Sequence, residues 1–177
     1  MNPVVLFERA ATEAAAMVEK VQPEQRDAPT PCSEWDVDAL VTHMAGGTTY
    51  LSAALGVDTD GGGSDSDYRA AVTRCVEASR APGALEGRCI SPAGFEWSVA
   101  EATAGTAMDQ LVHTWDLAVA IDADRQLDPE LVDAIVAMFL PQMPEIGREA
   151  GIVGPEVPVA DSASPQDRLL GAMGRRP

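Results

Sequence analysis

Residues 108–117 read MDQLVHTWDL and contain neither glycine nor proline. Their apolar side chains recur at helical spacing, at Met108, Leu111, Val112 and Trp115. Asp109 and His113 are four residues apart and therefore share one face of the predicted helix, and Asp116 extends this polar stripe by one turn. Burying such groups costs free energy unless they are paired or bound to a metal. The stretch therefore predicts a buried helix that carries a polar site.

His43 is another polar side chain within an apolar pattern. It lies in residues 30–44, TPCSEWDVDALVTHM. Ser33 or Asp36 can cap a helix here. The core stripe of this helix is formed by Val37, Leu40, Val41 and Met44. His43 lies at the edge of the stripe, and the chain has only two histidines. We expect this helix to bring His43 to the face that carries Asp109 and His113.

Helical periods recur along the rest of the chain and predict a bundle. The central helix is expected over about Val99–Ile121, and others over residues 4–21, 68–81, 129–141 and 165–173. The helix that carries His43 is expected to begin after Ser33 or Asp36 and to end at Leu55. Residues 56–67 are expected to form an exposed loop, 83–97 a loop or an irregular hairpin, and 151–165 an irregular arm. Gly46 and Gly47 either weaken their helix or let another helix approach, and the unbroken period favours close approach. The pattern predicts an all-α bundle in a single domain, residues 1–177.

Composition restricts the partners and the compartment. The formal net charge of -16 argues against nucleic acid and anionic membranes as partners, because both are bound through clustered Lys and Arg. No signal peptide and no apolar segment of membrane-spanning length is recognised, so a cytoplasmic protein is expected. The three cysteines have no C-x-x-C spacing and indicate neither a disulfide framework nor a thiolate zinc site. Cys32 is either a reactive thiol near the site or a small inert side chain, and the second interpretation is favoured.

His43, Asp109 and His113 are the candidate metal ligands. Two ligands one turn apart on one helix and a third from a facing helix are a recurrent arrangement in bundles. Two imidazoles and one carboxylate suit Zn²⁺, with Ni²⁺ or Fe²⁺ as alternatives, and leave a coordination position open. The competing interpretation is a pair of hydrogen-bonded core histidines beside a carboxylate. Asp116 could orient His113 or face solvent.

Trp35 and Trp115 flank the two ligand-bearing segments. They are either core anchors or the wall of an apolar, cofactor-binding pocket beside the metal.

Three segments carry a resemblance to a known family: TPCSEWDVDALVTHM, DQLVHTWDLAVA and the tail GPEVPVADSASPQDRLLGAMGR. Together they resemble the actinobacterial branch of the DinB-like superfamily, a metal-binding family related to the mycothiol-dependent maleylpyruvate isomerase, over most of the chain from Pro29 onward. The resemblance implies a DinB-like four-helix bundle, with extra short helices and a C-terminal arm in this chain, and a divalent metal, usually zinc or nickel. It assigns the ligands to His43, Asp109 and His113.

The resemblance also implies a reaction class, a metal-dependent S-transferase or isomerase that uses a low-molecular-weight thiol such as mycothiol and an electrophile. It does not extend to maleylpyruvate isomerisation itself, because the isomerase has a second, C-terminal domain for which this chain is too short. The residues single out no general acid or base, and Asp36, Asp116 and metal-bound water are candidates. A non-catalytic metal- or ligand-binding module is the main alternative, and a metal-activated hydrolase a weaker one. Relatives often dimerise, so a homodimer is also an expectation of the resemblance.

Overall fold

The computed structural model describes residues 1–57, 65–141 and 143–177. It divides into two compact units, Met1–Arg125 and Gln126–Pro177, and each is described by itself. The expectation of a single domain therefore stays a prediction. Most of the loop expected over residues 56–67 lies outside the described residues.

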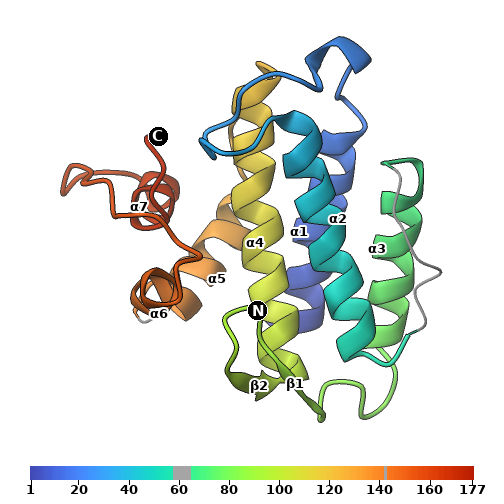
Figure 1. The fold of residues 1–177 in the computed structure, drawn as a ribbon. Helices are drawn as coiled ribbons and strands as arrows, with labels where there is room; N and C mark the ends of the chain where they lie inside the picture. Colours follow the sequence, from blue (N-terminus) through green and yellow to red (C-terminus); the bar gives the residue numbers. More distant parts are fainter. Residues whose placement is uncertain (58–64, 142) are drawn as a thin grey trace. The chain divides into compact units, whose positions relative to one another are not determined.

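The first unit is a bundle of four helices: α1 (Pro3–Val18), α2 (Val37–Ala54), α3 (Asp65–Ser79) and α4 (Val99–Ala120). Helices α1 and α4 run in one direction and α2 and α3 in the other (Figure 1). Each of α1 and α2 packs against both α3 and α4. Seventeen of the residues of α4 are buried, which agrees with the central place that its apolar sequence predicts. This unit is thus an all-α four-helix bundle.

The ends of the helices follow from their capping residues. Asp36 is the N-cap of α2, where its carboxylate accepts a hydrogen bond of 2.8 Å from the Ala39 N–H. Ser98 and Glu101 form a capping box at the start of α4. Of the two caps that the sequence allowed for α2, the structure selects Asp36 over Ser33.

The connection between α1 and α2 crosses the end of the bundle at which α4 ends (Figure 1). It contains a short 3-10 helix, η1 (Pro23–Gln25), and Gln25 Nε2 donates 3.2 Å to the Ile121 carbonyl just after α4. The Thr30 hydroxyl donates to the backbone carbonyls of Trp35 (2.8 Å) and Cys32 (3.1 Å). These bonds fix the segment that carries Cys32 and Trp35.

A small hairpin, β1 (Arg88–Ile90) and β2 (Glu96–Ser98), lies at the opposite end of the bundle, and Cys89 faces Trp97 in its antiparallel register. Trp97 packs on Gly105 of α4 so closely that a Cβ at Gly105 would lie 2.7 Å from a ring carbon. Its indole N–H donates 2.7 Å to the hydroxyl of Tyr50 on α2. The hairpin therefore joins α2 and α4 at this end.

The second unit contains α5 (Pro129–Phe139), α6 (Met143–Glu149) and α7 (Pro165–Ala172), and α5 packs against α7. Asp128 is the N-cap of α5, and Pro129 is its first residue, in agreement with the helix predicted to begin at residue 129. One element differs from the predicted ranges: α6 was not predicted, because its seven residues are too few to show a helical period. Met138 of α5 is 43% exposed.

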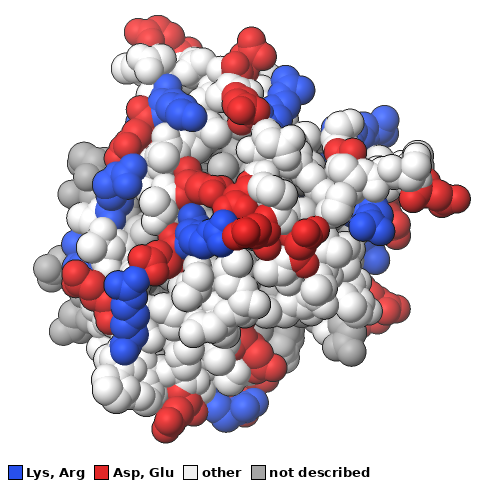
Figure 2. Space-filling view, turned by 180° about the vertical axis from the view of Figure 1, so that it is seen from behind, with Lys and Arg blue, Asp and Glu red and all other residues white. Residues whose placement is uncertain are grey.

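Acidic and basic side chains lie among uncharged ones on the face of the molecule that Figure 2 draws. On the face drawn in Figure 2, basic side chains of the described residues lie singly or beside acidic ones. Arg69 pairs with Glu19 (2.5 Å) and Arg80 with Glu8 (2.5 Å). Within the described residues, no helix is long and apolar enough to cross a membrane.

Candidate metal centre

The structure brings His43, Asp109 and His113 together between α2 and α4. Asp109 Oδ1 lies 3.1 Å from His43 Nε2 and 3.3 Å from His113 Nε2. One ligand atom from each residue lies within 4.8 Å of the others. The side chains of His43 and Asp109 are 37% and 31% exposed, whereas that of His113 is 9% exposed. The group is therefore open to solvent on the side of His43 and Asp109.

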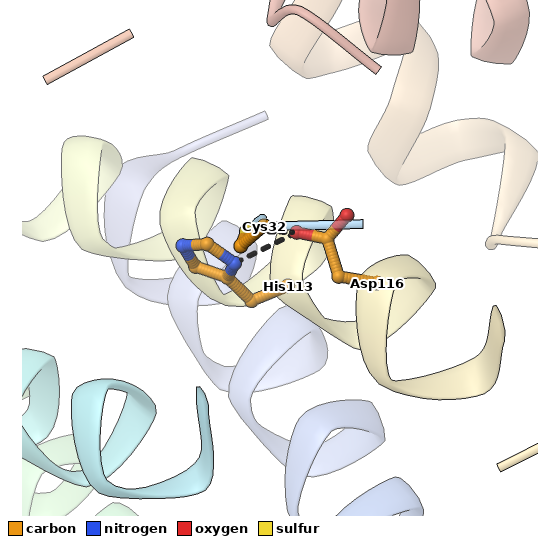
Figure 3. A group of neighbouring side chains, drawn as sticks. All are labelled: Cys32, His113 and Asp116. Atoms are coloured by element: carbon orange, nitrogen blue, oxygen red, sulfur yellow. Dashed lines mark hydrogen bonds and ion pairs between the residues drawn. The ribbon is translucent and has the colours of Figure 1, made fainter. Parts of the chain in front are cut away.

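The far nitrogen of His113 is held by Asp116. Asp116 Oδ2 lies 2.9 Å from His113 Nδ1 (Figure 3). The Asp116 side chain is completely buried. Asp116 therefore does not face solvent, which was one of its two expected positions. The same oxygen accepts a hydrogen bond of 3.4 Å from the Cys32 thiol, which lies beside the pair in Figure 3. The contact of Cys32 was not predicted, because 84 residues separate it from Asp116.

The two candidate tryptophans differ. Trp35 lies over the site, with its ring centroid 4.5 Å from that of His43 and 5.7 Å from that of His113. Trp115 is buried on α4 and, on a regular helix, lies about 160° around the axis from His113. Trp35 is thus positioned to form an apolar wall, while a pocket role for Trp115 stays a prediction.

A buried polar network beneath the site joins α2, α3 and α4. Gln110 donates 2.9 Å to the Met44 carbonyl and accepts a hydrogen bond from the Tyr68 hydroxyl. A Cβ at Gly47 would lie 3.2 Å from Gln110 Nε2 and 3.4 Å from Asp109 Oδ2, so this glycine lets the polar side chains of α4 approach α2. The close approach expected at Gly46 and Gly47 is confirmed at Gly47. The role of Gln110 was not predicted. The signal for it in the sequence was a polar side chain that follows Asp109 and precedes two apolar residues in a helix expected to be buried.

Mutual contact shifts the pKa values of the group. Burial raises the pKa of Asp109, but the charges and hydrogen bonds of His113 and His43 outweigh it and hold this pKa well below its usual range. Burial lowers the pKa of His113, but the Asp109 charge and the hydrogen bonds with Asp109, Asp116 and Cys32 outweigh it, so this pKa is raised well above its usual value. In the metal-free protein, both shifts favour the charged forms, a carboxylate beside an imidazolium.

The donor set fits a divalent metal. Zinc bonds to nitrogen and oxygen of about 2.1 Å in a tetrahedron place neighbouring ligand atoms about 3.4 Å apart. The two distances from Asp109 Oδ1, 3.1 and 3.3 Å, are close to this spacing. Asp116 supplies the carboxylate that commonly holds the second ring nitrogen of a metal-binding histidine.

Comparison with known proteins identifies the family of the chain. Residues 7–88 match the mycothiol maleylpyruvate isomerase N-terminal domain family. Over 180 aligned residues the chain is 30% identical to two mycobacterial proteins, Uncharacterized protein Rv0738 of Mycobacterium tuberculosis strain H37Rv and Uncharacterized protein MT0763 of strain CDC 1551. The alignment covers 99% of this chain and 98% of each relative. The chain belongs to the mycothiol maleylpyruvate isomerase N-terminal domain family.

The family match includes Cys32, Trp35 and His43 and ends before Asp109 and His113. The two candidate ligands on α4 are therefore supported by their geometry and not by the family match. No solved structure matches the chain significantly.

Proposed function

We propose that the protein binds one divalent metal, zinc or nickel, through His43 Nε2, Asp109 Oδ1 and His113 Nε2. We further propose that it uses the metal to activate a low-molecular-weight thiol of the mycothiol type for S-transfer to an electrophile or for isomerisation. The convergence of these three atoms, with a buried carboxylate on the far nitrogen of His113, is the observation that carries the proposal. Membership of the family supports the thiol.

Asp116 prepares His113 for this role. Its carboxylate accepts the Nδ1–H, so the lone pair of the neutral ring lies on Nε2, the atom that faces Asp109. Asp116 is fully buried and engaged with His113 and Cys32, which favours orientation of the ring over proton exchange with a substrate. Asp36 caps α2 through Ala39 and is exposed, so a general acid or base role for it has no support.

The open side of the group supports a reactive site rather than a closed structural one. His43 and Asp109 are each about one-third exposed, and Trp35 lies against both imidazoles. A bound divalent metal would supply a Lewis acid at which a thiol loses its proton. Trp35 would cover one side of this thiol and exclude water from it. The second substrate would be a small electrophile, such as a conjugated acid, an epoxide or an alkyl halide.

Elemental analysis of untagged protein tests the metal, with His43→Ala and Asp109→Ala beside it. We expect about one zinc or nickel per chain, lost in both variants. Asp38→Asn is the matched control, because Asp38 is an exposed carboxylate on the same helix as His43 and pairs with Arg26. Wild-type protein that holds no metal and takes up none on titration contradicts the proposal.

A thiol-plus-electrophile screen separates the enzyme from a non-catalytic binding module. Turnover that requires both the thiol and the metal supports the proposal. Thiol-dependent stabilisation without product supports the binding module. Product formed from an ester or amide without any thiol supports the metal-activated hydrolase.

A further inference from the structure

The imidazole of His113 lies between two carboxylates, one at each ring nitrogen. Nε2 is 3.3 Å from Asp109 Oδ1, and Nδ1 is 2.9 Å from Asp116 Oδ2. Each carboxylate belongs to a different group of potential metal ligands within the described residues. The first is His43, Asp109 and His113, and the second is Cys32, Asp116 and His113. His113 is the member that the two groups share.

The second group has the geometry of a compact donor set. Cys32 Sγ lies 3.4 Å from Asp116 Oδ2, and one ligand atom from each of the three residues lies within 4.8 Å of the others. Asp116 is completely buried and Cys32 half-buried, so the set lies deeper than His43 and Asp109. It also contains sulfur, which the first group lacks. Thiolate ligands select soft cations, whereas imidazole and carboxylate suit harder ones.

We propose that Cys32, Asp116 and His113 form a second metal site that takes thiophilic cations, such as Cd²⁺ or Cu⁺, and competes with the first site for His113. Binding replaces the thiol proton of Cys32, which passes to solvent. The metal binds Nδ1 of His113, and the ring keeps one proton, at Nε2: a neutral ring moves its proton from Nδ1 to Nε2, whereas an imidazolium releases its Nδ1 proton to solvent. No oxidation or reduction is involved.

Competition follows from the chemistry of the ring. A neutral imidazole has one lone pair and one N–H. When Nε2 binds a metal, Nδ1–H donates to Asp116, and when Nδ1 binds a metal, Nε2–H donates to Asp109. Asp109 is therefore a ligand when Nε2 binds the metal and orients the ring when Nδ1 binds it. Asp116 has the opposite roles. Filling the second site leaves the first with only His43 and Asp109.

Titration of the metal-free full-length chain with Cd²⁺ alone tests the second site, read out by thiolate-to-cadmium charge-transfer absorption in the near ultraviolet. We expect the band in wild type and in His43→Ala, which removes only the first site, and its loss in Cys32→Ser and Cys32→Ala. Cys89→Ser is the matched control, because Cys89 is the other half-buried thiol and belongs to neither group. A band that survives in both Cys32 variants, or that is absent from folded His43→Ala protein, overturns the proposal.

Zinc release tests the competition. This part alone rests on the proposed function, because it requires zinc at the first site. We expect Cd²⁺ to release about one zinc per cadmium bound from wild type, and to need at least tenfold more cadmium for the same release from Cys32→Ser. Cadmium bound through Cys32 without zinc release overturns the competition. If wild type takes up no zinc, the proposed function fails, while the cadmium band in His43→Ala still decides the second site.

Discussion

The interface between α2 and α4 has different residues and contacts at its two ends. At the hairpin end, Trp97 packs against Gly105 and donates a hydrogen bond to Tyr50. At the other end, Trp35 covers His43 and His113, whose neighbours are carboxylates. Trp97 packs between two helices, whereas Trp35 lies over polar groups that remain partly exposed. We therefore expect changes at the hairpin end to affect stability and changes at the histidine end to affect metal binding.

The largest effect is expected from Asp109→Asn, which keeps the size of the side chain and removes its charge. Loss of an outer-shell partner typically costs 10–100-fold in metal affinity, so loss of this central ligand should cost more than about 100-fold. Competition with a chelator of known affinity measures the change. Unaltered affinity in Asp109→Asn would remove Asp109 from the ligand set.

Gly105→Ala should destabilise the hairpin end without affecting the metal. The added Cβ would lie 2.7 Å from a ring carbon of Trp97, and such overpacking typically costs about 1–3 kcal/mol in the free energy of unfolding. Gly46→Ala is the control, because nothing lies within 4 Å of its Cβ and alanine favours a helix by about 0.5–1 kcal/mol. Urea unfolding should thus show opposite signs, and equal destabilisation by both would contradict the packing argument.

Asp116→Ala should weaken metal binding by about 10–100-fold while leaving one metal per chain at saturation, since it removes the partner of His113 Nδ1 but no ligand of the first site. Asp116→Asn, which keeps an acceptor oxygen, should have the smaller effect. Calorimetric titration measures both. A complete loss of stoichiometric binding in folded Asp116→Asn would show that Asp116 is itself a ligand.

Metal affinity and the stability of the metal-free protein should both depend on pH through His113. The pKa of His113 is raised well above 6.5, so the metal-free ring keeps its proton to higher pH and a metal must displace it. Metal affinity should therefore rise with pH until the raised pKa is passed. The stability of the metal-free protein should change in the opposite direction, since the stabilising imidazolium is present below the unfolded pKa and lost as pH rises through the folded pKa. Asp109→Asn should flatten both profiles, and unfolding curves at several pH values check this.

Helical spacing and capping residues are local signals, and they predicted a helical bundle and the helix over Val99–Ile121. The expectation of four helices came from the family resemblance, and the grouping of His43 with Asp109 and His113 came from the ligand arrangement that recurs in bundles. The sequence did not predict the contact of Cys32 with Asp116, since that contact depends on how the connection after α1 crosses the bundle. It also left Trp35 and Trp115 equivalent, whereas the structure brings only Trp35 into contact with the two histidines. Residue patterns thus did not predict where the irregular segment that carries Cys32 and Trp35 lies relative to α4.

X-ray absorption at the K edge of the metal, on protein that carries one equivalent of zinc or nickel, tests the central claim most directly. The account predicts a shell of nitrogen and oxygen near 2.0–2.2 Å with outer scattering from two imidazoles and no sulfur. A sulfur shell near 2.3 Å, or scattering from fewer than two imidazoles, would contradict the assignment of His43, Asp109 and His113 as the metal ligands.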